Sequence, residues 1–125
     1  MNIAASTFEF LKALKENNNR EWFNAHKAEY EKAKANVEDF IQELISKLST
    51  FDPYIEESIQ AKKCLFRIYR DVRFAKDKSP YKTWFAAGIS VDGRKLEGPE
   101  YYLHLGPDCS FMAVGYWRPK KEHLE

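Results

Sequence analysis

The sequence predicts an α+β domain in which an N-terminal helix and a long amphipathic helix pack on a mainly antiparallel sheet of about four strands. Apolar residues recur every three or four positions up to Leu48, and from Cys64 onward the period changes to two. Glycine-containing turn signals separate the later segments. Helical segments followed by hairpin-like segments favour the α+β class over alternating strands and helices.

The first helix is expected from Ser6 to about Glu16. Ser6 and Glu9 have the spacing of a capping box, in which each side chain satisfies a backbone N–H of the first turn. The apolar face of this helix consists of Phe8, Leu11 and Leu14. Three asparagines at 17–19 end the helix, because short amides hydrogen-bond to nearby backbone, and Asn19 is expected to cap the next helix.

The second helix is expected to be long, continuing to Asp52-Pro53, where proline restricts the preceding residue. Its apolar stripe consists of Trp22, His26, Tyr30, Ala33, Val37, Phe40, Ile41, Leu44, Ile45 and Leu48. The opposite face is charged, which is typical of an amphipathic helix packed on a core. We expect Trp22 and Phe40 to be buried where the helices meet the sheet.

The segments with strand character are 64–70, 84–91, 101–105 and 110–117. Asp92-Gly93 and the run Gly106-Pro107-Asp108 are turn signals between strands. The connection 71–83 has thirteen residues, which is long for a hairpin loop. Loops of this length in compact domains are usually functional or disordered, and the apolar residues Phe74, Pro80 and Tyr81 favour order.

Composition indicates one domain spanning residues 1–125, with 44% hydrophobic and 31% charged residues. No apolar stretch approaches the ~20 residues that span a bilayer. No secretory signal is present, so Cys64 and Cys109 are expected to be reduced thiols of a cytoplasmic protein. Too few ligands are available for a metal site, and no cofactor motif is found, so neither a metal nor a cofactor is expected.

The net charge of +1 conceals a basic middle segment. Residues 1–61 have seven Lys/Arg and eleven Asp/Glu, residues 62–95 have ten and three, and residues 96–125 have three and five. The middle segment therefore carries a net charge of +7. Clustered positive charge is unfavourable through self-repulsion, so this segment is where an anionic ligand or an acidic partner is expected.

The candidate ligand-binding residues are Arg67, Arg70, Arg73, Lys76, Lys78 and Lys82. Guanidinium forks suit phosphates and carboxylates, and we expect at least three of these cations to line one concavity. The alternative is that the arginines pair with nearby carboxylates while the lysines are solvated. The catalytic residue, if the protein is an enzyme, is unknown; the acid/base candidates are Asp71, Asp77, Tyr69 and His104.

The chain resembles the mostly bacterial family of unknown function numbered 2461 among the domains of unknown function. The resemblance depends on residues 18–23, 64–74, 76–82, 101–104 and 117–119. It implies no activity. Members of the family continue beyond the end of this chain, so the resemblance implies that the chain is an N-terminal portion.

Three functions fit these patterns. The first is binding of a small anionic ligand, bearing phosphate or carboxylate, with or without catalysis. The second is a protein–protein interaction module whose basic patch meets an acidic partner. The third is weak nucleic-acid binding by aromatic residues among the cations, which is less favoured because the net charge is near zero. No membrane association is expected.

Overall fold

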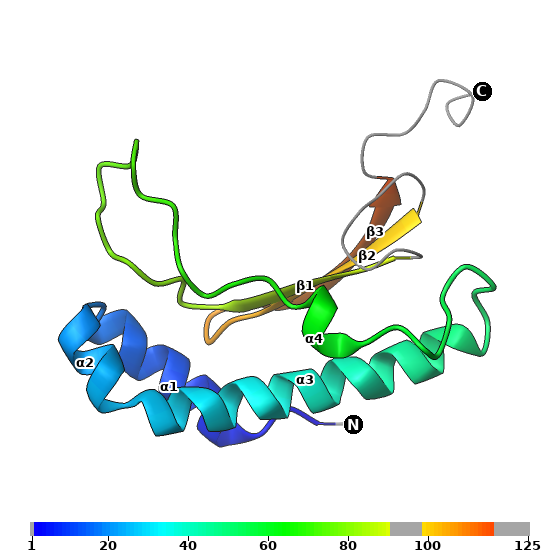
Figure 1. Ribbon diagram of the computed structural model, residues 1–125, viewed down its shortest axis with the longest axis horizontal. Coiled ribbons are helices and arrows are strands. Elements are labelled where there is room, and N and C mark those ends of the chain that lie inside the picture. The colour runs from blue at the N-terminus through cyan, green and yellow to red at the C-terminus, as the bar shows by residue number, and fades with distance from the viewer. Residues whose placement is uncertain (1, 91–98, 117–125) are drawn as a thin grey trace.

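The structure, a computed structural model, describes residues 2–90 and 99–116. Its elements are α1 (Ala5–Glu16), α2 (Arg20–Ala25), α3 (Lys27–Ser49), α4 (Ala61–Cys64), β1 (Phe85–Ile89), β2 (Pro99–Leu105) and β3 (Ser110–Tyr116). The helices lie along one face of an antiparallel sheet with strand order β1-β2-β3 (Figure 1). The α+β class and the antiparallel sheet are confirmed. None of the described helices combines the length and apolar character needed to cross a lipid bilayer.

The start of α1 is held by a residue of another helix. The expected capping box of Ser6 and Glu9 is wrong, because the N-cap is Ala4 and no side chain of the helix caps it. Instead, Oδ1 of Asn36 accepts hydrogen bonds from Ala4 N at 2.9 Å and from the hydroxyl of buried Thr7 at 2.8 Å. One amide of α3 therefore stabilises the first turn of α1 and fixes where the two helices meet.

The single long helix expected after Asn19 is two helices, α2 and α3, that meet at His26. Asn19 caps α2 as predicted, since its Oδ1 accepts from Trp22 N at 2.8 Å. His26 leaves the helical conformation, with φ −112° and ψ 22°. Its ring atom Nδ1 lies 2.8 Å from the Trp22 carbonyl oxygen, which also accepts from the His26 backbone at 3.0 Å. The break between α2 and α3 therefore coincides with a bond from the His26 side chain to the preceding turn.

The predicted stripe of α3 is confirmed as the centre of the core. Its buried members are Tyr30, Ala33, Val37, Ile41, Leu44, Ile45 and Leu48. Leu11 and Leu14 of α1 are fully buried against this helix. Trp22 and Phe40 pack against the core but are only partly buried, so the expectation that both are buried is wrong. Each ring contacts the core with one part and leaves the rest accessible to solvent.

The inner face of the sheet is apolar and meets the helices. On β1 it presents Phe85, Ala87 and Ile89, and the residues of β2 opposite the first two are Leu105 and Leu103. The predicted turn at 106–108 is confirmed, since Leu105 pairs with Ser110 across it. The Asp92-Gly93 turn lies outside the described residues.

The predicted strand at 64–70 is wrong, and the described sheet has three strands. Leu65 pairs with Ala87 and Tyr69 pairs with Tyr81, both as isolated antiparallel bridges. Between these two bridges lie three residues on one segment (66–68) and five on the other (82–86). This mismatch is a bulge opposite Arg67, and it prevents a continuous ladder. Residues 64–70 alternate like a strand, but the extra residues in the facing segment break the pairing between the two.

Residues 65–84 form an extended two-sided projection, here called the arm, which leaves the sheet at the start of β1 and rises above α2 in the view of Figure 1. Its base is held by Asn18, in the α1–α2 loop. The Asn18 amide donates to Tyr81 O at 2.9 Å and accepts from Tyr81 N at 3.1 Å. The ring of Tyr81 stacks on buried Phe23 with centroids 4.1 Å apart. These contacts fix the arm against the helices.

Candidate functional site

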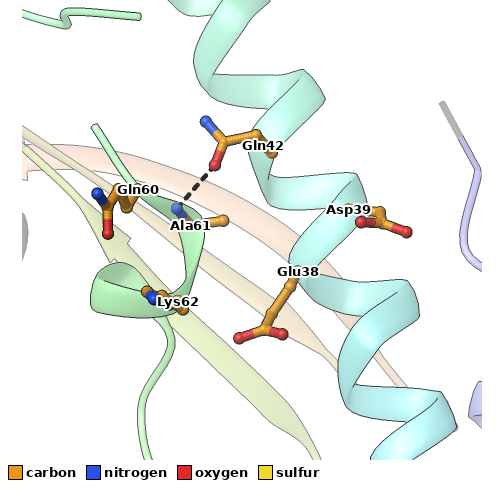
Figure 2. A pocket seen from close by; sticks show the side chains of 6 residues that line it. All are labelled: Glu38, Asp39, Gln42, Gln60, Ala61 and Lys62. Carbon is orange, nitrogen blue, oxygen red and sulfur yellow. Dashed lines mark hydrogen bonds between the residues drawn. The ribbon is translucent and has the colours of Figure 1, made fainter. Parts of the chain in front are cut away.

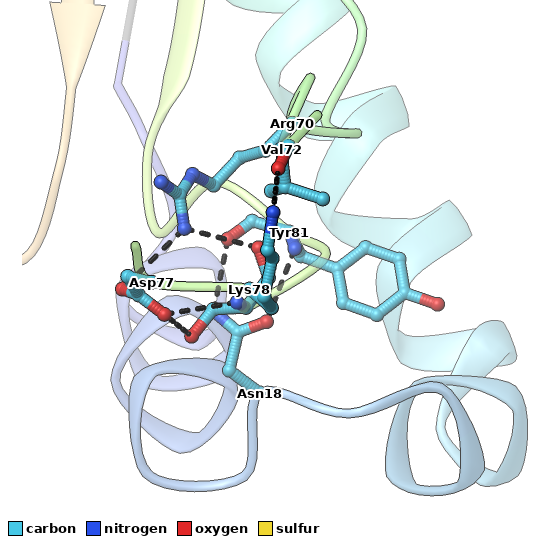
Figure 3. Close-up of polar contacts among 7 residues, drawn as sticks. Asn18, Arg70, Val72, Asp77, Lys78 and Tyr81 are labelled. Carbon is cyan, nitrogen blue, oxygen red and sulfur yellow. Dashed lines mark hydrogen bonds and ion pairs between the residues drawn. The ribbon is translucent and has the colours of Figure 1, made fainter. Parts of the chain in front are cut away.

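The basic segment predicted from the sequence forms the arm, and Arg70 is its most enclosed ion-paired cation. The Arg70 side chain is 25% exposed, against 76% for Arg73. Its Nη1 atom donates to Ser79 O at 3.0 Å and lies 3.4 Å from Asp77 Oδ2 (Figure 3). Within the described residues, both contacts of the guanidinium use Nη1, so Nε and Nη2 keep their donors available.

Asp77 is held mainly by Ser79 and only secondarily by Arg70. Its Oδ1 accepts from Ser79 N at 2.9 Å and from the Ser79 hydroxyl at 2.6 Å. These hydrogen bonds are the main reason that the pKa of Asp77 is lowered, and the charge of Arg70 adds to them. Asp77 is therefore ionised at neutral pH, in a position set by its own turn.

A cavity of about 360 Å³ opens beside these residues, and we call it the arm cavity. Its walls are formed by Lys15, Asn18, Arg70, Asp77, Ser79, Tyr81, Thr83 and Trp84. The volume is at the lower end of the range for small-molecule sites. The walls combine two cations, a carboxylate, polar groups and two aromatic rings, a composition that suits a ligand with both polar and planar parts.

Two of the other predicted cations are engaged near the tip of the arm. Arg73 forms a two-pronged ion pair with Asp71, with Nε–Oδ1 at 3.0 Å and Nη2–Oδ2 at 2.8 Å. Both side chains are largely exposed, so solvent screens this pair. Lys78 donates from Nζ to Val72 O at 2.6 Å, which braces the loop (Figure 3). These residues maintain the shape of the loop.

The remaining three cations are dispersed along the arm. The guanidinium of Arg67 lies 5.5 Å from the ring centroid of Tyr69, and Lys82 Nζ lies 6.0 Å from that of Phe66. Lys76 is exposed. The expectation that at least three of the six cations line one concavity is therefore wrong for the arm cavity, which one of them lines. The spacing of the six cations in the sequence could not indicate which way their side chains would point on either side of the bulge.

The two carboxylate candidates for acid/base chemistry are both stabilised in the charged form. Hydrogen bonds from Arg73 lower the pKa of Asp71, as those from Ser79 lower that of Asp77. Of the four acid/base candidates, Asp77 lines the arm cavity. A carboxylate with a lowered pKa is a weak base at neutral pH, so Asp77 is suited to orienting a ligand and poorly suited to removing a proton.

The other two candidates are aromatic and lie on different surfaces. Tyr69 is 49% exposed, and its ring centroid is 5.6 Å from that of Tyr81. His104 lies on β2, in a stack between Trp84 and Phe111. Burial lowers the pKa of His104, so the imidazole is neutral at neutral pH. The structure thus separates the four residues instead of forming one catalytic group.

No sequence pattern indicated that Lys15 belongs to the site. Lys15 lies in the last turn of α1, and its Nζ donates to Asp108 Oδ2 at 2.9 Å. This pairing raises the pKa of Lys15 and lowers that of Asp108. The contact between Asn18 and the arm was also missed, although Asn18 begins one of the motifs of the family resemblance. Both contacts join residues far apart in sequence, which no local pattern encodes.

A second cavity, of about 330 Å³, lies between α3 and α4 (Figure 2). Its central residue is Gln42, whose Oε1 accepts from Ala61 N at 3.0 Å and whose Nε2 donates to Ile59 O at 2.9 Å. The amide is therefore used to hold the start of α4. No group of three or more His, Cys, Asp or Glu side chains within residues 2–90 and 99–116 is placed to hold a metal ion.

The fold and the site together define a helix-covered antiparallel α+β domain with a projecting basic arm. The chain belongs to the family described as "Conserved hypothetical protein (DUF2461)", whose model matches residues 6–125. The family predicted from the sequence motifs is thus confirmed. No curated protein and no solved structure matches the chain.

Proposed function

We propose that this protein binds a small anionic ligand, bearing a phosphate or carboxylate group, in the arm cavity. The observation that carries the proposal is the state of Arg70. Its side chain is three-quarters buried in the cavity wall, yet its contacts among the described residues use a single nitrogen. A guanidinium held in place with free donors is suited to two-pronged recognition of an anion.

The pairing of Arg70 with Asp77 leaves room for a competing anion. At 3.4 Å the contact is longer than the ~2.7–2.9 Å of a good charge-assisted hydrogen bond. The pair of Arg73 and Asp71, by contrast, closes at 2.8 Å with both prongs used. An incoming phosphate or carboxylate can therefore occupy the free side of Arg70 while Asp77 stays in its turn with Ser79.

Lys15, from the last turn of α1, supplies a second positive charge in the lining of the cavity. Its partner Asp108 is 75% exposed, so the existing ion pair is solvated and can exchange for a ligand. The proposal is for binding. The carboxylate in the cavity has a lowered pKa, and the proposal includes no proton-transfer step.

A second candidate function, docking of an acidic protein partner, is favoured by the tip of the arm. Phe74 is 94% exposed, and the guanidinium of Arg73 lies 5.7 Å from its ring centroid. An exposed aromatic ring beside cations is a common anchor at protein interfaces. We also propose a cytoplasmic location, supported by the exposed free thiol of Cys109, which a reducing compartment preserves.

The test is titration of the protein with inorganic phosphate, pyrophosphate and a dicarboxylate, followed by calorimetry and amide NMR shifts. Hydrogen bonds to charged groups contribute about 1.5–3 kcal/mol, so Arg70→Lys should weaken binding by roughly tenfold or more. The matched control is Arg73→Lys, which changes a cation of the same arm outside the cavity and should leave the affinity unchanged.

Thermal unfolding of Arg70→Lys checks that the loss of its bond to Ser79 O has not unfolded the arm. Equal weakening by the two substitutions would indicate a diffuse charge effect and would contradict the proposal. Binding that depends on Arg73 and Phe74, with an acidic peptide as the ligand, would favour the second candidate.

A further inference from the structure

The outer face of the sheet carries a row of stacked rings that ends at the arm cavity. The ring centroids of Trp84 and His104 are 5.7 Å apart at an interplanar angle of 21°. Those of His104 and Phe111 are 4.9 Å apart at 11°. His104 thus lies between two rings nearly parallel to it, and Trp84 is the member of the row that also lines the cavity.

Strand register explains why these rings form a row. His104 on β2 is directly opposite Phe111 on β3 and Ala86 on β1. Trp84 lies two residues before Ala86, which puts it diagonally next to His104 on the same face. The core residues of β1 point to the other face, toward the helices. The register of the strands therefore determines the position of the row.

The environment of the row keeps its imidazole uncharged. Burial lowers the pKa of His104, so its ring is neutral at neutral pH and stacks as an ordinary aromatic. The β2–β3 turn closes against the same rings. A Cβ on Gly106 would lie 3.4 Å from His104 Nε2, 3.5 Å from Trp84 Cβ and 3.1 Å from Cys109 O, so the backbone supports the Trp84–His104 pair closely.

We propose that the ligand of the arm cavity is nucleotide-like, with a planar ring that stacks on Trp84 and an anionic group that Arg70 binds. The inference rests on the proposed function, since it assigns a second part to the ligand of the same cavity. A flat indole and a guanidinium with free donors on the walls of one cavity match those two parts. Stacking tolerates any base, so the class is nucleotide-like without a preferred base.

Three probes separate the two parts of the ligand: inorganic phosphate, ribose 5-phosphate and adenosine monophosphate. Ribose 5-phosphate is the matched ligand control, because it has the sugar and the phosphate without the planar base. On the unaltered protein, adenosine monophosphate should bind roughly tenfold or more tightly than ribose 5-phosphate. It should also shift the indole NMR signal of Trp84, which ribose 5-phosphate should not do.

The variants are Trp84→Phe, Trp84→Leu and Phe111→Leu. Trp84→Phe keeps a stacking surface and should keep most of the preference for adenosine monophosphate. Trp84→Leu removes the flat ring but keeps an apolar side chain, and it should reduce that preference to about twofold or less, with phosphate affinity unchanged. Phe111→Leu alters the far end of the row, outside the cavity, and should preserve the preference.

The outcomes distinguish the two proposals. If all three probes bind with equal affinity and depend on Arg70, the anion site stands and the nucleotide-like ligand is refuted. If none binds, both proposals are refuted. A preference for adenosine monophosphate that persists in Trp84→Leu would place the ring elsewhere and refute the inference. The inference would also be refuted if a folded Trp84→Leu protein lost as much affinity for inorganic phosphate as for adenosine monophosphate.

Discussion

Replacement of Asn18 by alanine should release the arm from the helices. Asn18 joins the α1–α2 loop to the arm through one donated and one accepted hydrogen bond with the backbone of Tyr81. Tyr81 is 4% exposed, so water does not readily replace either bond. Two hydrogen bonds at ~1 kcal/mol each, plus the cost of leaving buried backbone groups unpaired, give a loss of about 2–4 kcal/mol in unfolding free energy.

The measurement is urea denaturation of Asn18→Ala together with hydrogen exchange at the Tyr81 amide, which should become faster. The matched control is the neighbouring Asn19→Ala. Asn19 caps α2, so its loss should cost about 1 kcal/mol and leave exchange at Tyr81 unchanged. An Asn18→Ala protein that loses less than about 0.5 kcal/mol, with Tyr81 still protected, would show that the asparagine does not hold the arm.

Three further predictions concern the helices. Trp22→Ala should cost less than the ~3–5 kcal/mol of a fully buried aromatic, because Trp22 is only partly buried, and a loss within that range in chemical denaturation would contradict this expectation. Asn36→Ala should destabilise by about 1–3 kcal/mol and loosen the first turn of α1, as amide exchange will show, whereas unchanged exchange would exclude a capping role. Burial raises the pKa of Tyr30 to about 12, above its ordinary 10.0, so its contribution to stability is complete below pH 10 and is lost as pH rises from 10 to 12. An ultraviolet titration compared with Tyr30→Phe should find this midpoint, and a midpoint near 10 would contradict the burial.

The predictions that succeeded were those that depend on local physics. The stripe of α3 follows from a period of 3.6 residues and a need to bury one face, so Val37, Ile41 and Ile45 were identified without knowledge of their partners. The cap at Asn19 and the turn at 106–108 are equally local. The α+β class followed because helical and strand periods occupied separate parts of the chain.

The predictions that failed depend on contacts between distant residues. Asn36 holds the start of α1 across 29 residues, in place of the expected local box. Residues 65–70 alternate like a strand, but the bulge on the other side of the arm interrupts their pairing. The candidate site shows the same limit. Arg70 could be nominated from composition, whereas its neighbour Lys15 could not, because nothing in the sequence relates the end of α1 to the arm.

The bulge opposite Arg67 has a consequence for how the molecule opens. Beyond the bulge, the arm makes no hydrogen bonds within the β1–β2 ladder. The arm and the sheet can therefore lose their hydrogen bonds separately. Amides of the arm, such as Arg70 and Lys82, should then exchange through small openings that leave the sheet intact. A ligand held by Arg70 on the arm and Lys15 on α1 would connect the arm to the helices, so its binding would slow exchange in the arm more than in the sheet.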